Sequence, residues 1–440
     1  MKIGVISLGC DKNRVDTEWM LGILTGKGYQ IEQDPASCDI LIVNTCAFIE
    51  SAKQEAIETI LEMAQYKQNG VCKCLVVSGC LPQRYMQDLH AQMPEVDLWL
   101  GTARYSELPQ ALEAFFAKQS YTPCMPNARS SRQQSGPRVL TTPYHYAYLK
   151  IAEGCSNGCT YCAIPQIRGG FTSRPMEEIV QEAKDLIAQY GVKELILVAQ
   201  DVARYGLDLY GEVRLVELLR RLCELDLHWV RLLYLYPERV TDDLLDYMAN
   251  EPKICKYLDI PCQHYSDTIL SNMHRHVTSA QLDGLMDKIR SYGCFTVRST
   301  FIVGFPQESE EDFAQLYDFI ERAKFDRCGF FAYSKEDGTL AAKMKGQIPA
   351  ATKRKRCKQL YALQQQIMQE KQRATIGSVV EVLYDGIDYD RQMFIGRTQA
   401  DAPDVDAVVY FTSEQPLEIG QFYSVRIIDT DQEDRIGECV

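Results

Sequence analysis

The chain has 440 residues, 46% of them hydrophobic and 24% charged, which is typical of a globular protein of about three domains. No apolar run approaches the roughly 18 residues of a membrane helix, and the N-terminus lacks the features of a signal peptide, so we predict a cytoplasmic protein without membrane segments. The formal net charge of -13 argues against a protein held to nucleic acid by bulk electrostatics.

Seventeen cysteines are unusual for a chain of this kind. The cytoplasm keeps thiols reduced, so cysteines in tight patterns are better explained by metal or cluster ligation than by disulfides. Others, such as Cys223, Cys294 and Cys328, lie in apolar segments, where we expect them to be small buried hydrophobic residues.

In residues 1–132, three short apolar runs each end on a thiol, at Cys10, Cys46 and Cys80. Apolar runs that alternate with helical stretches (14–25, 51–66 and 82–92) predict a parallel sheet with helices on its faces. Ligands collect at the carboxyl ends of such strands. We therefore predict that the three thiols converge to hold an iron-sulfur cluster with one uncommitted iron; three buried loop cysteines are the alternative.

Three amide side chains lie beside these thiols, those of Asn13, Asn44 and Gln83. They could donate hydrogen bonds to cluster sulfur, or they could simply cap helices and form turns. Residues 118–142 contain several prolines and read as a connecting segment, with the linker itself placed at residues 133–143.

Residues 144–349 contain six strand-like runs, at 146–152, 194–199, 229–236, 257–261, 295–303 and 328–333. Helical segments lie between them, with start signals at Ser173, Thr241 and Ser309 and stop signals at Gly191 and Gly293. Six strand-helix repeats are two short of a closed eightfold barrel. We predict an open, partial (βα)6 barrel whose site lies at the carboxyl ends of its strands.

A loop with three cysteines, Cys155-x3-Cys159-x2-Cys162, follows the first of these strands. Three thiols can ligate three corners of a 4Fe-4S cluster and leave one iron open, since such clusters normally have four cysteine ligands. Polar side chains at other strand ends could complete a pocket for a zwitterionic cofactor, although such residues often only satisfy loop backbone. They are Gln200, Asp201, Gln263, His264, Arg298 and Thr300, with Gly304 closing the fifth strand.

The cysteine loop, with Tyr161 before its last thiol, resembles the signature of the radical S-adenosylmethionine (SAM) enzymes, in which the open iron binds SAM. The flanking Glu153-Gly154, Arg168-Gly169 and Ser173-Arg174-Pro175 resemble the methylthiotransferase branch, as do the three N-terminal cysteines. The resemblance implies two 4Fe-4S clusters, held by Cys10, Cys46, Cys80, Cys155, Cys159 and Cys162. For SAM it points to Tyr161, Gln200, Gln263, Arg298, Thr300 and Gly304 as contacts.

The chemistry implied by this resemblance is sulfur insertion at an unactivated carbon. No side-chain base can deprotonate such a carbon, because environments shift a pKa by only about 3–5 units, so cofactors must supply radical chemistry. The resemblance implies a radical derived from SAM, a methylthio group assembled on the N-terminal cluster, and an electron donor of flavodoxin or ferredoxin type. It identifies no catalytic side chain.

Lys353-Arg-Lys-Arg356 opens a helical segment at 350–373, which we expect to be a solvated connecting helix rather than a nucleic-acid contact. Residues 374–440 contain five short strands (379–384, 392–398, 407–412, 421–429 and 434–439) and predict a small all-β barrel of OB-like type. This part resembles the TRAM domain that ends methylthiotransferases.

The predicted barrel holds fourteen Asp and Glu residues against four Arg and no Lys. Such a surface repels phosphates and attracts basic proteins, which disfavours direct RNA binding and favours a basic ribosomal protein or the small ribosomal subunit as partner. A finer resemblance agrees with this: Ser7–Asp16, Val198–Asp201 and Leu258–His264 resemble the members that methylthiolate the β-carbon of an aspartate in ribosomal protein S-twelve. The alternatives are a tRNA-adenosine methylthiotransferase and a non-catalytic iron-sulfur or RNA-binding protein.

Overall fold

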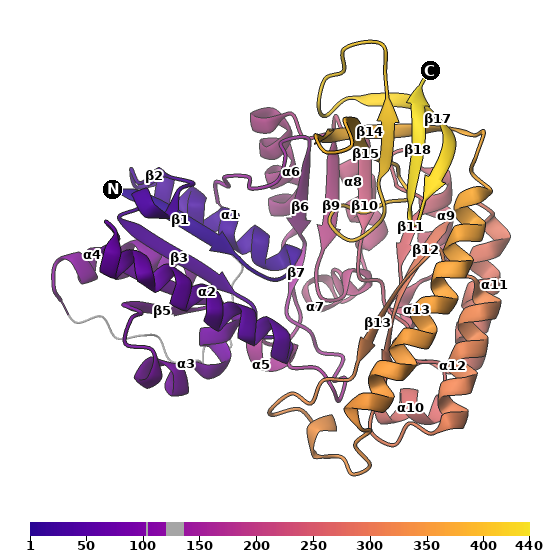
Figure 1. Ribbon diagram of the computed structural model, residues 1–440, viewed down its shortest axis with the longest axis horizontal. Coiled ribbons are helices and arrows are strands. Elements are labelled where there is room, and N and C mark those ends of the chain that lie inside the picture. Colours follow the sequence, from indigo (N-terminus) through magenta and orange to yellow (C-terminus); the bar gives the residue numbers. More distant parts are fainter. Residues whose placement is uncertain (103, 120–135) are drawn as a thin grey trace.

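A computed structural model describes residues 1–102, 104–119 and 136–440 and confirms the predicted α/β architecture (Figure 1). An N-terminal sheet domain lies beside an open central barrel, and a small C-terminal barrel covers one end of the central strands. Most of the connecting segment predicted at 118–142 falls on residues 120–135, which lie outside the described residues.

The N-terminal strands form a parallel sheet in the order β2-β1-β3-β4-β5. Every residue of β3 and β4 is buried, as expected of strands that are covered on both faces. Helices α2 and α3 pack on one face, and α1 and α4 on the other. The strands are β1 (Lys2–Ser7), β2 (Gln30–Ile31), β3 (Ile40–Thr45), β4 (Cys74–Gly79) and β5 (Leu98–Gly101). The helices are α1 (Asp11–Gly26), α2 (Glu50–Asn69), α3 (Cys80–Gln92), α4 (Leu108–Phe116), η1 (Pro35–Ser37) and η2 (Tyr105–Glu107).

The central domain is the predicted open (βα)6 barrel. Its strands form two parallel sheets, β10-β9-β6 and β11-β12-β13, which a bridge between Val230 and Ile254 joins. The strands are β6 (Tyr146–Lys150), β9 (Glu194–Val198), β10 (Trp229–Leu232), β11 (Tyr257–Asp259), β12 (Thr296–Val303) and β13 (Arg327–Ala332). The helices between them are α6 (Met176–Tyr190), α8 (Leu215–Cys223), α9 (Asp242–Asn250), α11 (Ser279–Tyr292) and α12 (Glu310–Ala323). Shorter elements in the loops are β7 (Ala152–Glu153), α5 (Ile164–Arg168), β8 (Thr172–Ser173), η3 (Val202–Arg204), α7 (Leu207–Tyr210), η4 (Pro237–Arg239), α10 (Asp267–Asn272) and η5 (Ala341–Lys343).

Most of the predicted helix boundaries are confirmed. Thr241 and Ser309 cap α9 and α12 through their hydroxyl groups, and Gly191 and Gly293 end α6 and α11 with φ of +72° and +70°. Helix α6 begins at Met176, as predicted, but Ser173 does not cap it, because its hydroxyl donates to Asp208 Oδ1 at 2.6 Å.

The strand predicted at 229–236 is shorter than expected. It ends at Leu232, since Tyr234 adopts a left-handed φ of +63° that breaks the extended backbone.

Helix α13 (Ala350–Arg373) differs from the solvated connecting helix that we expected. Leu360, Leu363 and Ile367 form an apolar stripe that packs into the core of the central barrel. Its basic start is also engaged: Arg356 is buried and donates to Glu308 Oε1 at 2.5 Å, and Lys353 donates to the Tyr333 carbonyl at 2.7 Å. The expectation was wrong because it rested on the charged residues at the start of the helix. It did not take into account the helical spacing of Leu360, Leu363 and Ile367 that follows them.

The C-terminal domain is a closed barrel in the order β14-β15-β16-β18-β17, which confirms the predicted small β-barrel. Its strands are β14 (Val379–Asp388), β15 (Met393–Arg397), β16 (Val409–Thr412), β17 (Phe422–Asp431) and β18 (Asp434–Cys439). It docks on the amino ends of the central strands: Glu194, the first residue of β9, pairs with Arg397 at 2.8 Å and with Arg231 at 2.7 Å. The C-terminal domain therefore does not cover the carboxyl ends of those strands, where the cysteine loop lies.

Cysteines outside the two triads have mixed environments. Cys223 is buried and Cys328 partly buried, whereas Cys294 is exposed, so the prediction of a buried residue was wrong there. It follows Gly293 directly, in the turn that leaves α11. All cysteines of the described residues are free thiols. Within the same residues, no helix combines the length and apolar character that crossing a bilayer requires.

Candidate functional site

The N-terminal cysteines lie at one edge of the sheet. Cys10 precedes α1, Cys46 follows β3, and Cys80 begins α3 directly after β4. Because β1, β3 and β4 are parallel neighbours in register, these three strand ends lie at the same level. At Gly9 the backbone packs so tightly that an added Cβ would lie 2.6 Å from Cys46 Cβ and 3.1 Å from its Sγ.

The N-terminal thiols differ in their surroundings. Burial raises the pKa of the Cys80 thiol to about 12, and the positive charge of Arg168 acts in the opposite direction. Burial, followed by the neighbouring Cys10, raises the pKa of Cys46. Since cysteine binds iron as a thiolate, the loss of these protons must accompany ligation, and a cation next to Cys80 favours it.

Thiols are the kind of ligand that an iron-sulfur cluster takes. Within the described ranges, no three His, Cys, Asp or Glu side chains have the geometry of a site for one metal ion. A cubic cluster holds each of its cysteines on a different iron, so its thiols need not converge on one point.

The amides beside these thiols serve the backbone. Asn13 Nδ2 donates to the carbonyls of Leu8 and Thr45 at 2.9 and 3.0 Å, and Asn44 Nδ2 donates to the Asn13 carbonyl at 2.9 Å. The side chain of Gln83 lies against Gly101. The structure therefore supports turn formation for Asn44, whereas Asn13 both holds the backbone and contacts a thiol, since Cys80 Sγ lies 3.8 Å from Asn13 Oδ1.

The second set of thiols follows β7 in a loop that its own backbone holds closed. Cys155 N donates to the Gly169 carbonyl at 3.1 Å, and Cys162 N donates to the Cys159 carbonyl at 3.1 Å. Ile164 N donates to Cys162 Sγ at 3.4 Å. Burial raises the pKa of Cys155, and it raises that of Cys162 to about 12. These three thiols are thus brought together by local structure.

A buried polar clamp fixes this loop to the end of β9. Asp201 Oδ2 accepts hydrogen bonds from Asn157 Nδ2 at 2.9 Å and from Arg239 at 2.8 Å. Arg239 also donates to Asn157 Oδ1 at 3.0 Å, which closes the triangle. The sequence predicted Asp201 at the site. No sequence pattern indicated that Asn157 and Arg239 would be its partners.

Aromatic side chains border the same loop. Tyr236 Oη lies 3.8 Å from Cys159 Sγ, and the Arg275 guanidinium lies 4.1 Å from the centre of the Tyr236 ring. Tyr161 is partly buried and packs in a cluster with Met273 and Phe305. Aromatic and apolar side chains thus pack against this side of the loop.

The strand-end residues predicted for SAM have the following partners. Gln200 Nε2 donates to Glu153 Oε1 at 3.0 Å. Gln263 adopts a left-handed φ of +71° and donates its N–H to the Thr300 carbonyl at 2.8 Å, so this residue of the loop that follows β11 lies against the middle of β12. His264 is buried, with Nε2 3.5 Å from a carboxylate oxygen of Glu308.

Two of the predicted SAM contacts are engaged elsewhere in the fold. Gly304 has a φ of +71°, and an added Cβ would lie 2.3 Å from Lys353 Cγ of α13. Arg298 Nη1 lies 3.2 Å from Asp259 Oδ1, and its Nε lies 3.5 Å from Asp406 Oδ1 of the C-terminal domain. Close packing against Lys353 explains why a glycine stands at position 304, and ion pairing explains the placement of Arg298. SAM contact by any of the predicted residues stays a prediction.

A buried ionic network crosses from the N-terminal domain to the central barrel. Arg168 Nη1 lies 3.0 Å from both Asp16 Oδ2 and Glu153 Oε2, and Lys150 Nζ lies 2.7 Å from Glu153 Oε2 and also contacts Asp16. Sequence reasoning missed this network. Its one usable signal was Lys150, a charged residue in an apolar strand, which must find a partner when it is buried.

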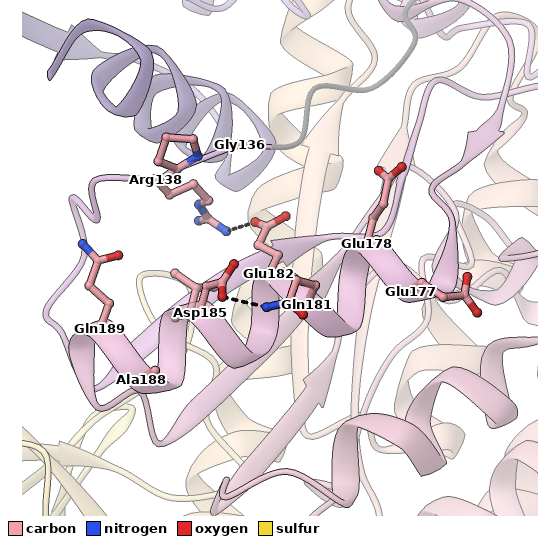
Figure 2. Close-up of a pocket in the computed structure, with 11 residues that line it drawn as sticks. Gly136, Arg138, Glu177, Glu178, Gln181, Glu182, Asp185, Ala188 and Gln189 are labelled. Carbon is pink, nitrogen blue, oxygen red and sulfur yellow. Dashed lines mark hydrogen bonds and ion pairs between the residues drawn. The ribbon is translucent and has the colours of Figure 1, made fainter. Parts of the chain in front are cut away.

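A separate hollow runs along α6 (Figure 2). Its lining includes Glu177, Glu178 and Asp185, together with an Arg138–Glu182 ion pair of 2.6 Å. None of the six cysteines of the two sets lines it, so it is distinct from both thiol sites.

Comparisons with known proteins agree with this division of the chain. Models of three protein families match it: "Uncharacterized protein family UPF0004" at residues 2–101, the radical SAM superfamily at 149–320, and the TRAM domain at 376–440. The matched ranges correspond to the sheet domain, the central barrel and the C-terminal barrel.

Similar curated proteins span the whole chain. The protein of Desulforamulus reducens named "Ribosomal protein uS12 methylthiotransferase RimO" is 48% identical over 99% of each chain. Its namesake in Acetivibrio thermocellus is 46% identical over all of this chain and 98% of that protein.

Solved structures support the fold. The radical SAM methyltransferase TsrM from Kitasatospora setae has a TM-score of 0.57 at 15% identity and covers 75% of this chain and 72% of its own. The cobalamin-dependent radical SAM enzyme OxsB has a TM-score of 0.52 at 11% identity, over 78% of this chain and 54% of its own.

Proposed function

Because this chain belongs to the family of ribosomal protein uS12 methylthiotransferases, we propose that it inserts a methylthio group at the β-carbon of an aspartyl residue of ribosomal protein S-twelve. The chain is a transferase of the radical SAM superfamily, and that superfamily implies SAM and a 4Fe-4S cluster as cofactors. The family accounts for the reaction class, and the particular substrate is the proposal.

One observation carries the proposal: three cysteines at the carboxyl ends of the N-terminal strands and three cysteines in the loop after β7 lie on either side of one domain interface, which Arg168 bridges. Cys80 of the N-terminal set contacts Arg168, which pairs with Glu153, two residues before Cys155. A transfer reaction that joins a radical to a sulfur atom needs both sites to face one substrate.

We assign one 4Fe-4S cluster to Cys155, Cys159 and Cys162 and a second to Cys10, Cys46 and Cys80. When bound, these clusters and SAM supply the radical and the sulfur that side chains lack. Of this chain's own residues, Tyr161, Gln200, Gln263, Arg298, Thr300 and Gly304 are proposed to hold SAM. The Asn157–Asp201–Arg239 triangle orients the loop, and the aromatic cluster beside it excludes water.

The surface charge of the C-terminal barrel supports a basic protein as partner. Several of its carboxylates are paired within the fold, but Asp390, Glu414, Glu418, Asp429 and Glu433 remain exposed. Such a surface favours a basic ribosomal protein, free or within the small subunit, over direct contact with RNA phosphates. We propose a flavodoxin- or ferredoxin-type protein as electron donor and a cytoplasmic location.

The test compares two substrates in parallel reactions. Anaerobically reconstituted enzyme is incubated with SAM, a strong reductant and either purified ribosomal protein S-twelve or bulk tRNA. We expect 5'-deoxyadenosine in the presence of the ribosomal protein, and we expect tandem mass spectrometry to place one methylthio group on an aspartyl residue.

A Cys155→Ala/Cys159→Ala/Cys162→Ala variant is the control and should form no product. A methylthio-nucleoside in the tRNA, with the ribosomal protein unmodified, would assign the enzyme to tRNA instead. The complete absence of 5'-deoxyadenosine would leave a non-catalytic iron-sulfur protein.

A further inference from the structure

Arg168, at the end of α5 in the central domain, lies against a thiol of the N-terminal domain. Its Nη2 is 3.8 Å from Cys80 Sγ and 2.7 Å from Asn13 Oδ1. Its Nη1 pairs with Asp16 and Glu153 at 3.0 Å each. One planar guanidinium thus contacts a carboxylate from each domain and a cysteine that we assign to the second cluster.

The burial of this group makes its contacts strong. The Arg168 side chain is 2% exposed and that of Asp16 is fully buried. A guanidinium does not lose its proton in proteins, so Arg168 remains positively charged at this place. In so dry a setting a charge acts on its neighbours more strongly than it would in water.

Domain docking alone would require only the two carboxylates. The Nη2 atom of Arg168 contacts Asn13 Oδ1 and the Cys80 sulfur instead. The arginine therefore also contacts the N-terminal thiol site. Hydrogen bonds and positive charge at a ligating sulfur stabilise the reduced, more negative form of an iron-sulfur cluster. A residue of the domain that carries one thiol set is therefore placed to influence the other.

We propose that Arg168 is a positioning residue for the N-terminal cluster, which holds Cys80 in place as a ligand and raises the reduction potential of that cluster. This inference rests on the second cluster of the proposed function. The property concerned is the reduction potential of this cluster relative to that of the cluster in the barrel. The cysteine ligands alone do not determine it.

The experiment isolates the N-terminal cluster. In full-length protein carrying Cys155→Ala, Cys159→Ala and Cys162→Ala, this cluster is the only one that the assigned ligands can hold. Its midpoint potential is followed by electron paramagnetic resonance during an anaerobic redox titration, with Arg168 retained or replaced. We expect Arg168→Gln to shift the midpoint to a more negative value, and Arg168→Lys, which keeps the charge but loses the planar fork, to shift it less.

Arg138→Gln is the matched control. Arg138 is also buried and also links the domains, through Glu18 of α1 and Glu182 of α6, but among the described residues none of its hydrogen-bond or ion-pair partners is a cysteine. Replacing it should lower the melting temperature about as much as Arg168→Gln does and should leave the midpoint unchanged.

The outcomes separate the two proposals. An unchanged midpoint in Arg168→Gln with its cluster intact overturns the inference, as does an equal loss of iron in the Arg168 and Arg138 variants. Loss of iron from Arg168→Gln alone supports its hold on Cys80. If the triple cysteine variant with Arg168 retained assembles no cluster, it is the second cluster of the proposed function that fails.

Discussion

At the scale of single residues, glycine decides whether the cysteine loop can close. Gly154 has a φ of +73°, and a Cβ there would lie 2.3 Å from the Gly170 carbonyl oxygen. Gly158, inside the loop, has nearly the same φ of +71° but open space around the Cβ position. A left-handed backbone by itself costs a side chain about 1–2 kcal/mol, so the two glycines differ mainly in the steric overlap.

We therefore predict that Gly154→Ala removes the barrel cluster while Gly158→Ala largely retains it. The overlap at Gly154 forces the backbone away from Gly170 and opens the loop between Cys155 and Gly169. Iron analysis after anaerobic reconstitution should find about half the iron of the parent protein in Gly154→Ala, since one of two clusters is lost. Equal iron in the two variants would contradict this account.

At the scale of elements, α13 acts as part of the central barrel. Its apolar stripe joins the core, and its Lys353 side chain covers Gly304 at the end of β12. Arg356 neutralises the buried Glu308, whose other carboxylate oxygen accepts the Gly304 N–H at 2.7 Å. The helix thus supports the strand end where we predict a SAM contact.

Truncating the stripe of α13 should destabilise the protein. Leu360 is fully buried, and Leu360→Ala should cost about 2–5 kcal/mol through lost transfer free energy and the cavity left behind. The melting temperature measured by differential scanning calorimetry should fall. Gln359→Ala, at the exposed neighbouring position, is the control and should melt within error of the parent; a similar fall in both variants would argue against burial as the cause.

At the scale of the whole molecule, all three domains contribute side chains to one buried cluster. Val15 and Trp19 of α1, Tyr148 of β6, and Leu383 and Ala402 of the C-terminal domain belong to a single buried cluster. The first helix and the terminal barrel thus contribute to the core of an open barrel whose six strands do not close. Ion pairs at the amino ends of those strands reinforce this arrangement.

Asp401 gives this docking a pH dependence. Burial works to raise its pKa, but the positive charges of Arg435 and Arg327 outweigh burial and lower the pKa to about 2. Its stabilising contribution is therefore complete above the usual carboxyl pKa of about 3.9 and is lost as the pH falls through about 2. Asp401→Asn removes the buried carboxylate that pairs with both Arg327 and Arg435, at a cost of about 3–5 kcal/mol at pH 7.

The corresponding measurement is thermal melting from pH 7 down to pH 2. The difference in melting temperature between the parent protein and Asp401→Asn should be large at pH 7 and should shrink at the acid end. Asp318→Asn, at an exposed carboxylate, is the control and should show little difference at any pH. A constant difference for Asp401→Asn across this range would rule out its charge as the cause.

The sequence by itself determined the three-part fold and brought out both cysteine sets. Apolar runs, helix caps and thiols at strand ends are local patterns, and parallel strands bring their carboxyl ends together whatever their order. The tertiary structure alone decided how the domains meet. Asp16, Lys150, Glu153 and Arg168 pair across an interface between segments far apart in the chain, and the apolar face of α13 finds its partner only in the folded barrel. Such pairings depend on packing between elements, which local sequence does not encode, and they join the two thiol sites.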